Sequence, residues 1–119
     1  MNTIVFVNLS SFTDTPMRTP ESTYVRRIDI STPLENPGNP VEVIEVVYAL
    51  WAKIAPELKT AVEGGDDIVI ALPGSTLMSA AISSVANNSL TTKVGFITAT
   101  REGENQYVFD LSPSRILRL

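Results

Sequence analysis

The sequence predicts a small Rossmann-like α/β domain: a mostly parallel sheet of about five strands with a C-terminal β-hairpin, and helices packed on the sheet. Three observations predict this class. Nearly continuous apolar runs alternate with helical patterns along the chain. The runs are rich in β-branched residues, which is typical of parallel strands that are covered on both faces. The last run follows a polar turn, Glu102–Gln106, which favours a hairpin.

Composition limits both the size of the protein and its partners. The 119 residues, 44% apolar and 18% charged, fit one compact domain over residues 1–119 that buries roughly two thirds of its unfolded-chain surface. The net charge of −4 argues against binding long DNA or RNA, which requires a basic face. No window approaches the roughly 18 apolar residues of a membrane span, and the N-terminus lacks the basic flank of a signal peptide. We therefore expect a soluble cytoplasmic protein with no membrane partner.

The first part of the chain predicts two strands. Thr3–Asn8 is β-branched and aromatic and is expected to be a central strand. Leu9–Ser22 lacks a helical period and predicts a loop long enough to suggest function or mobility. Thr23–Ile30 fits an edge strand, because the pair Arg26–Arg27 places one charged side chain on each face. Ser31–Asn39 contains prolines and a glycine and predicts a turn-rich connection.

A long amphipathic helix follows, and its start carries capping signals. Asn39 suits the N-cap, Pro40 the first helical position and Glu42 the capping-box position. Pro56 lacks a backbone donor and is expected to kink or divide the helix, which Gly64–Gly65 ends. The stripe expected to face the sheet consists of Ile44, Val47, Tyr48, Trp51, Ile54, Ala55, Leu58 and Val62.

Two further strands flank a second helix. Asp67–Leu72 and Lys93–Thr98 have the composition of buried strands, and Ser75–Ala86 between them predicts a helix. Right-handed crossovers would place the first, third and fourth strands side by side. One face of the second helix is nearly flat, which allows close packing against the sheet or against a second copy of the chain, and we expect a homodimer. The small residues of this helix are Ser79, Ala80, Ala81, Ser83, Ser84 and Ala86.

The C-terminal region predicts the hairpin. Tyr107–Leu111 is short and partly apolar, and it is expected to pair with the preceding strand, Lys93–Thr98. Ser112–Leu119 predicts one helical turn or a tail, with Arg115 and Arg118 solvated.

The candidate site lies at the carboxyl ends of the parallel strands, where ligands of open α/β sheets bind. Topology brings together there the loop Leu9–Thr13, the turn Pro73–Thr76 and Thr100–Arg101. The turn opens a helix, so unpaired N–H groups and the helix dipole favour a phosphate. An ordinary strand-to-helix turn with a Ser75 cap explains the same residues, and both interpretations stay open. The polar and turn residues expected at this edge are Asn8, Ser10, Ser11, Pro73, Gly74, Ser75, Thr76 and Arg101.

Missing residue types restrict the chemistry. The chain has no histidine and no cysteine, which excludes a histidine general base, a cysteine nucleophile, a Ser-His-Asp triad and thiolate or imidazole zinc sites. The pair Asp66–Asp67 lies at the amino end of its strand, opposite the candidate site, and is interpreted as part of a turn. We expect no metal and no cofactor, and no catalytic residue is assigned.

Three short motifs resemble a known family. The first predicted strand ends in Asn-Leu-Ser (residues 8–10), a later apolar strand ends in Pro-Gly (residues 73–74) before a small-residue helix, and the closing hairpin ends in Asp-Leu (residues 110–111). Together they are similar to the small CRISPR-associated Csx proteins of type III systems, specifically the fifteenth of that series. The resemblance spans most of the chain.

The resemblance implies a Rossmann-like homodimer, related to CARF domains and ring nucleases, that binds cyclic tetra-adenylate, the second messenger of type III CRISPR antiviral defence. Members of the family lower the messenger level by sequestering or cleaving it. A histidine commonly follows the first-strand serine, where this chain has Ser11 and Phe12, so binding is favoured over cleavage. The implied ligand contacts are Asn8, Ser10, Ser11, Gly74, Ser75 and Thr76, and the apolar slots for adenine are Leu9, Phe12 and Leu77.

Three functions therefore stay open. A binding protein would release the cyclic ligand intact. A metal-independent ring nuclease would hold the ribose 2′-hydroxyl in line as nucleophile and stabilise the transition-state charge. A Rossmann-type interaction domain would bind no nucleotide.

Overall fold

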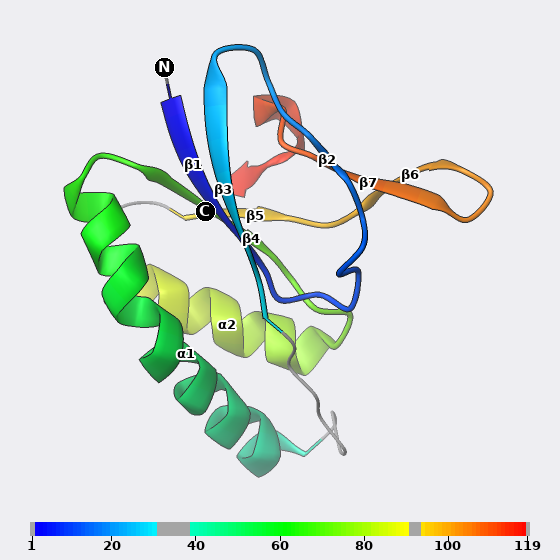
Figure 1. Cartoon of the computed structure of the whole chain (residues 1–119). Coiled ribbons are helices and arrows are strands. Elements are labelled where there is room, and N and C mark those ends of the chain that lie inside the picture. The colour runs from blue at the N-terminus through cyan, green and yellow to red at the C-terminus, as the bar shows by residue number, and fades with distance from the viewer. Residues whose placement is uncertain (1, 31–38, 91–93, 119) are drawn as a thin grey trace.

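The computed structural model describes residues 2–30, 39–90 and 94–118 of the chain (Figure 1). Its main element is a five-stranded sheet in the order β3-β1-β4-β5-β8, in which the first four strands are parallel and β8 is antiparallel. The strands are β1 (Asn2–Asn8), β3 (Thr23–Asp29), β4 (Asp67–Ala71), β5 (Gly95–Ile97) and β8 (Leu117–Arg118). The predicted fold class, the central position of β1, the edge position of β3 and the neighbouring positions of β1, β4 and β5 are confirmed.

Two helices, α1 (Pro40–Glu63) and α2 (Thr76–Ser89), cover one face of this sheet (Figure 1). Right-handed crossovers lead from β3 over β1 to β4, and then from β4 to β5. Because both advance in the same direction across the sheet, both helices lie on the same side. They pack on alternate strand residues such as Val5 and Val7 of β1 and Ile68 of β4.

The opposite face is covered by a small second sheet in the order β2-β7-β6. Its strands are β2 (Met17–Arg18), β6 (Thr100–Gly103) and β7 (Gln106–Asp110). Phe109 of β7 packs on Phe6 of β1, with ring centroids 5.1 Å apart. The same cluster buries Ile4, Val69, Ala71, Ile97 and Leu111. The fold therefore has three layers: helices, central sheet and small sheet.

The start of α1 confirms its predicted cap, but its buried stripe differs from the prediction. The Asn39 side chain accepts hydrogen bonds from N–H groups of the first helical turn. Trp51 is buried as expected, whereas Ile44 is exposed and Tyr48 is 64% exposed, so the prediction that these two are core residues is wrong. The buried stripe keeps the five central residues of the predicted one and is displaced to one side of it, where Val43, Leu50 and Ala61 replace Ile44, Tyr48 and Val62. The buried residues are Val43, Val47, Leu50, Trp51, Ile54, Ala55, Leu58 and Ala61.

Pro56 does not divide α1, which is continuous from Pro40 to Glu63, so the predicted division is wrong. An interior proline loses the hydrogen bond to the carbonyl four residues earlier, here Ala52, and its ring crowds that carbonyl. Ala52 is exposed, so water can replace that bond. Thr60 Oγ1 also donates to the Pro56 carbonyl at 3.0 Å within the following turn.

Three other boundaries differ from expectation. The long loop after β1 contains β2. Tyr107–Leu111 forms a hairpin with β6 and not with β5, because the chain leaves the central sheet after Ile97 and adds a strand. α2 extends past Ala86 to Ser89, where the buried Leu90 ends it and donates its N–H to the Ala86 carbonyl.

The C-terminal segment is bound to the central sheet. Pro113–Arg115 forms the predicted helical turn. Arg118 is not simply solvated as predicted, because its guanidinium donates to both carboxylate oxygens of Asp67 at 3.0 and 2.5 Å. Gly95 leaves room for this crossing, since a Cβ there would lie 2.4 Å from Cγ2 of Ile116.

Three predicted segments lie partly beyond the described residues: the connection Ser31–Asn39, apart from Asn39, the start of the strand Lys93–Thr98, and the end of Ser112–Leu119. Within the described ranges, neither helix has the length and apolarity needed to cross a bilayer.

Candidate functional site

The candidate site lies at the switch point of the central sheet. The chain leaves β1 toward β3 on one side and later forms β4 on the other, so the segments after β1 and β4 begin beside each other. Asn8 is paired with Ala71, and the Leu9 N–H donates to the Ala71 carbonyl at 3.0 Å. Two of the three segments predicted to meet, residues 9–13 and 73–76, therefore start side by side at the carboxyl edge (Figure 1).

Asn8 anchors the loop that leaves β1. Its amide nitrogen donates to the Phe12 carbonyl at 3.0 Å and to Asp29 Oδ1 at 2.7 Å. Its side-chain oxygen accepts from the Ser10 N–H at 3.0 Å and from the Ser10 hydroxyl at 2.5 Å. Ser10 Oγ in turn accepts from the Phe12 N–H at 3.2 Å. Both side chains are buried, and their hydrogen bonds are those of a turn that shapes the loop.

Arg27 completes this network, although its sequence context predicts only edge protection. Its side chain is 19% exposed. The guanidinium donates to Asp29 Oδ2 at 2.9 Å and to the carbonyls of Thr15 and Thr13 at 2.6 and 3.2 Å. It also lies over the rings of Phe6 in β1 and Phe109 in β7, 5.7 and 5.6 Å from their centroids. Arg27 therefore binds the long loop to the sheet.

The neighbouring Arg26 faces the helical layer, where it forms an ion pair with Glu57 of α1. The predicted placement of Arg26 and Arg27 on opposite faces of the strand is thus confirmed. The spacing of Arg27 and Asp29 is the sequence signal for the network, because residues two apart in a strand share a face. Their link to Asn8 and to the loop carbonyls depends on the sheet register.

The second half of the site is the turn before α2. Ser75 is the N-cap, and its Oγ accepts from a backbone N–H three residues later at 3.3 Å. Ser79 Oγ donates to the Pro73 carbonyl at 2.8 Å and braces the turn. Thr76 and Leu77 begin the helix with exposed side chains. Their N–H groups precede the first intrahelical hydrogen bonds and lie at the positive end of the helix dipole.

Gly74 is exposed, and the fold does not require glycine at this position. Its φ lies outside the left-handed region, and among the described residues nothing lies within 4 Å of the place a Cβ would occupy. A bare backbone with open space beside a helix start allows close approach of a ligand.

The loop after β1 also presents exposed side chains. Ser11 and Phe12 are both exposed. The Phe12 ring contacts the Tyr107 ring of β7, with centroids 5.3 Å apart. Tyr107 pairs with Arg101 across the hairpin, and Arg101 Nε donates to the Gly103 carbonyl at 3.2 Å. No local sequence pattern indicates the position of Tyr107, because it depends on the pairing of β7 with β6 and β2 in the small sheet.

The three residues predicted as adenine slots differ in exposure. Phe12 and Leu77 present their side chains to solvent. Leu9 is buried in the core beneath the helices, so only its backbone lies at the edge.

The edge offers backbone N–H groups, hydroxyls and aromatic surface. Within the described residues, every buried side-chain nitrogen and oxygen has a hydrogen-bond partner. Nor do any three acidic side chains of this part of the chain gather in a group that could hold a metal ion. Donors of this kind at a helix start suit an anionic ligand.

Asp29 makes the network sensitive to acid. Burial raises its pKa, but the hydrogen bonds from Arg27 and Asn8 together with the Arg27 charge lower it, and the net pKa lies below the ordinary value. A carboxyl with a depressed folded-state pKa stabilises the fold above its unfolded pKa and loses this contribution as pH falls through the folded value. We expect stability to decrease below about pH 4, and we expect Asp29→Asn to make the decrease shallower.

Thermal unfolding of both proteins across this pH range measures the difference. Asp14→Asn makes the same change at an exposed position of the loop after β1, outside the hydrogen-bond network of Asp29, and is the matched control expected to unfold as wild type across this range. An Asp29→Asn protein with the wild-type acid dependence would contradict the assignment.

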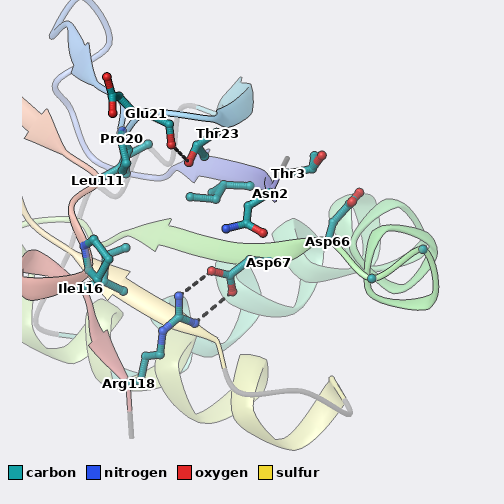
Figure 2. A pocket seen from close by; sticks show the side chains of 14 residues that line it. Asn2, Thr3, Pro20, Glu21, Thr23, Asp66, Asp67, Leu111, Ile116 and Arg118 are labelled. Atoms are coloured by element: carbon teal, nitrogen blue, oxygen red, sulfur yellow. Dashed lines mark hydrogen bonds and ion pairs between the residues drawn. The ribbon is translucent and has the colours of Figure 1, made fainter.

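A hollow of about 600 Å³ lies at the opposite, amino-terminal edge of the sheet (Figure 2). Asp67 and Arg118 face each other there, joined by their ion pair, and Asp66 lies at the rim (Figure 2). The predicted location of Asp66–Asp67, away from the candidate site, is confirmed.

Fold and edge together define an α/β protein with a mostly parallel Rossmann-like sheet and a polar switch-point edge. No family model, curated protein or solved structure matches the chain.

Proposed function

We propose that this protein binds cyclic oligoadenylate, specifically cyclic tetra-adenylate, in the cytoplasm and lowers its free concentration in type III CRISPR antiviral signalling. The observation that carries the proposal is that the loop after β1 and the open turn before α2 begin side by side at the switch point, because they follow the paired strands β1 and β4. Gly74 supports a ligand at this turn, because the space that a side chain at position 74 would occupy is open and a ligand can approach the backbone there.

The chemistry of the edge fits phosphodiester groups. The N–H groups of Thr76 and Leu77 and the dipole of α2 favour negative charge near Gly74. The exposed Ser11 and Thr76 hydroxyls add donors from both segments. Backbone and hydroxyl donors explain how a chain of net charge −4 would bind a small anion without a basic surface.

Sequestration is favoured over cleavage. A general base works best with a pKa near the operating pH. The carboxylate that binds Asn8 at the base of the loop, Asp29, is also held by Arg27, and its pKa is shifted in the opposite direction, below the ordinary value. The chain also has no histidine or cysteine that could act as the general base, so its chemistry favours binding of the cyclic ligand over cleavage.

A homodimer is part of the proposal, because a ring of equivalent phosphates suits two symmetric copies of the same edge. The helical layer carries a surface suited to a second copy. Val41, Ile44 and Tyr48 of α1 are exposed apolar side chains. A groove between the helices is lined by Ile44 and Tyr48 of α1 and by Ala81 and Ser84 of the small-residue helix.

Calorimetric titration with cyclic tetra-adenylate, followed by chromatography of the recovered ligand, tests the proposal. We expect one ring per two chains, a dimer in sedimentation velocity, and intact ligand after incubation. Gly74→Leu should abolish binding by filling the open space, while its free energy of unfolding stays within about 0.5 kcal/mol of wild type, as for most exposed substitutions.

Other outcomes identify the alternatives. Linear di-adenylate products would assign a metal-independent ring nuclease instead. A wild-type protein that binds no cyclic oligoadenylate would overturn the proposal in favour of an interaction domain. Sedimentation as a monomer at micromolar concentration, with or without ligand, would contradict the dimer.

A further inference from the structure

Two aromatic rings are exposed beside the candidate site and contact each other. Phe12 of the loop after β1 is 41% exposed and Tyr107 of β7 is 36% exposed. Their centroids lie 5.3 Å apart, with an angle of 39° between the ring planes. The other aromatic pair, Phe6 with Phe109, is buried in the core. Contiguous exposed apolar surface of this kind marks a contact site more often than an isolated exposed residue does.

The strand pattern places this pair at the carboxyl edge. Tyr107 and Phe109 share one face of β7 because they are two residues apart. Phe109 packs on Phe6 between the two sheets. Tyr107, two residues earlier in β7, contacts Phe12 in the loop that begins after Asn8. The pair therefore borders the edge on the face opposite the helices, while Leu77 borders it on the helical side.

The backbone under Phe12 is held in place. Its N–H donates to Ser10 Oγ, and its carbonyl accepts from the Asn8 amide. Arg27 donates to the carbonyls of Thr13 and Thr15 just beyond it. A loop whose backbone is held in this way loses little conformational freedom on binding a partner, which favours affinity.

A hollow of about 840 Å³ adjoins the two rings. Phe12 and Tyr107 form one part of its wall, and Asn105 and Gln106 bring side-chain amides to another. Amide groups both donate and accept, as the edge of a nucleobase does. Arg101, paired with Tyr107 across the hairpin, lies on the same face and keeps donors beyond the one used by Gly103.

We propose that Phe12 and Tyr107 form the platform on which an adenine base of the bound cyclic oligonucleotide stacks. The inference rests on the proposed function and adds its base-recognition surface. Aromatic side chains stack on any base through its π face. The turn before α2 would then hold phosphate, while this pair holds base.

Affinity for cyclic tetra-adenylate in Tyr107→Leu and Phe12→Leu tests the platform. Each substitution keeps an apolar side chain and removes the ring. We expect each to weaken binding between about 5-fold and 150-fold, which corresponds to the range for removing an aromatic side chain on which a base stacks. Tyr107→Phe keeps the ring and should weaken binding less than Tyr107→Leu. Tyr24→Leu makes the same change at an exposed tyrosine near the amino end of β3 and is the control, expected to bind as wild type.

A second measurement separates this inference from the proposed function. In wild-type protein titrated with linear tetra-adenylate, the ring proton resonances of Phe12 and Tyr107 should shift and those of Tyr24 should not. If wild type binds the cyclic ligand and both leucine variants bind equally well, the platform is overturned and the proposed function stands. If wild type does not bind the cyclic ligand, the proposed function fails, and unshifted Phe12 and Tyr107 resonances with the linear ligand overturn the platform as well.

Discussion

Replacing Arg27 by leucine is expected to lower the free energy of unfolding by about 2 kcal/mol, in the range for removing a donor that makes hydrogen bonds to a charged group and to partly buried carbonyls. The substitution would leave Asp29 without its cation and two loop carbonyls without their donor. It would also remove the cation that lies over Phe6 and Phe109. Urea unfolding at neutral pH, followed by the fluorescence of Trp51, measures the loss.

The adjacent arginine provides the control. Arg26 is 48% exposed, and its ion pair with Glu57 is a surface pair, so Arg26→Leu should cost less than about 1 kcal/mol. Arg27→Lys should recover only part of the stability, because an ammonium cannot reproduce the planar fork that reaches the carboxylate and both carbonyls. Equal unfolding free energies for Arg27→Leu and Arg26→Leu would show that the network is not a main stabilising feature.

Gly95→Ala is expected to destabilise the protein by about 2 kcal/mol, as overpacking substitutions in well-packed regions do. The added Cβ would lie 2.4 Å from Cγ2 of Ile116 and 3.4 Å from the guanidinium carbon of Arg118. The C-terminal segment would have to move away from β5. That movement would weaken both the β5–β8 pairing and the ion pair of Arg118 with Asp67. Urea unfolding measures the total, and amide hydrogen exchange of Phe96 reports the pairing.

A second glycine makes the experiment specific. Gly74→Ala adds the same methyl group where no described atom lies within 4 Å, so its unfolding free energy should stay within about 1 kcal/mol of wild type. Combining Gly95→Ala with Ile116→Ala removes the clashing methyl and should cost less than the sum of the two single changes. A Gly95→Ala protein as stable as Gly74→Ala would contradict the close packing of β8.

Local signals identified most of the elements. The β-branched runs ending at Asn8 and Leu72 predicted strands, and Asn39 with Pro40 marked the start of α1 within one residue of its position in the structure. Such signals act over a few residues, through capping hydrogen bonds and continuous apolar composition. The side-by-side order of β1, β4 and β5 followed from one general rule, the handedness of crossovers.

The incorrect predictions about α1 arise where two local arrangements of the helix have nearly the same free energy. Tyr48 and Val43 lie at opposite margins of one apolar face of α1, and only the fit of the helix on the sheet buried Val43 and left Tyr48 in solvent. Pro56 is a helix breaker by local rules, yet packing on both sides of it and the exposure of Ala52 make one continuous helix acceptable. In both cases tertiary packing outweighs a local preference of a few tenths to a few kcal/mol.

The candidate site divides in the same way. The chain alone pointed to the turn before α2 and to the loop after β1, because the carboxyl ends of parallel strands share an edge. It did not indicate that the side chains of Asn8 and Ser10 form hydrogen bonds within the turn itself. Nor did it indicate that Arg27 and Asp29 hold that turn in place. Those contacts join residues whose distance in the chain is bridged only by the register of β1 with β3.

Interactions between residues close in the chain thus determine the main strands, the cap of α1 and, through their order, the fold class. The sequence alone therefore predicts them. The path of the hairpin over the sheet depends on long-range packing of Phe109 against Phe6, and this packing alone brings Tyr107 to Phe12. The return of β8 across Gly95 likewise depends on the partner Asp67 in a distant strand. Contacts between remote residues carry no local pattern, so only the tertiary structure decides them.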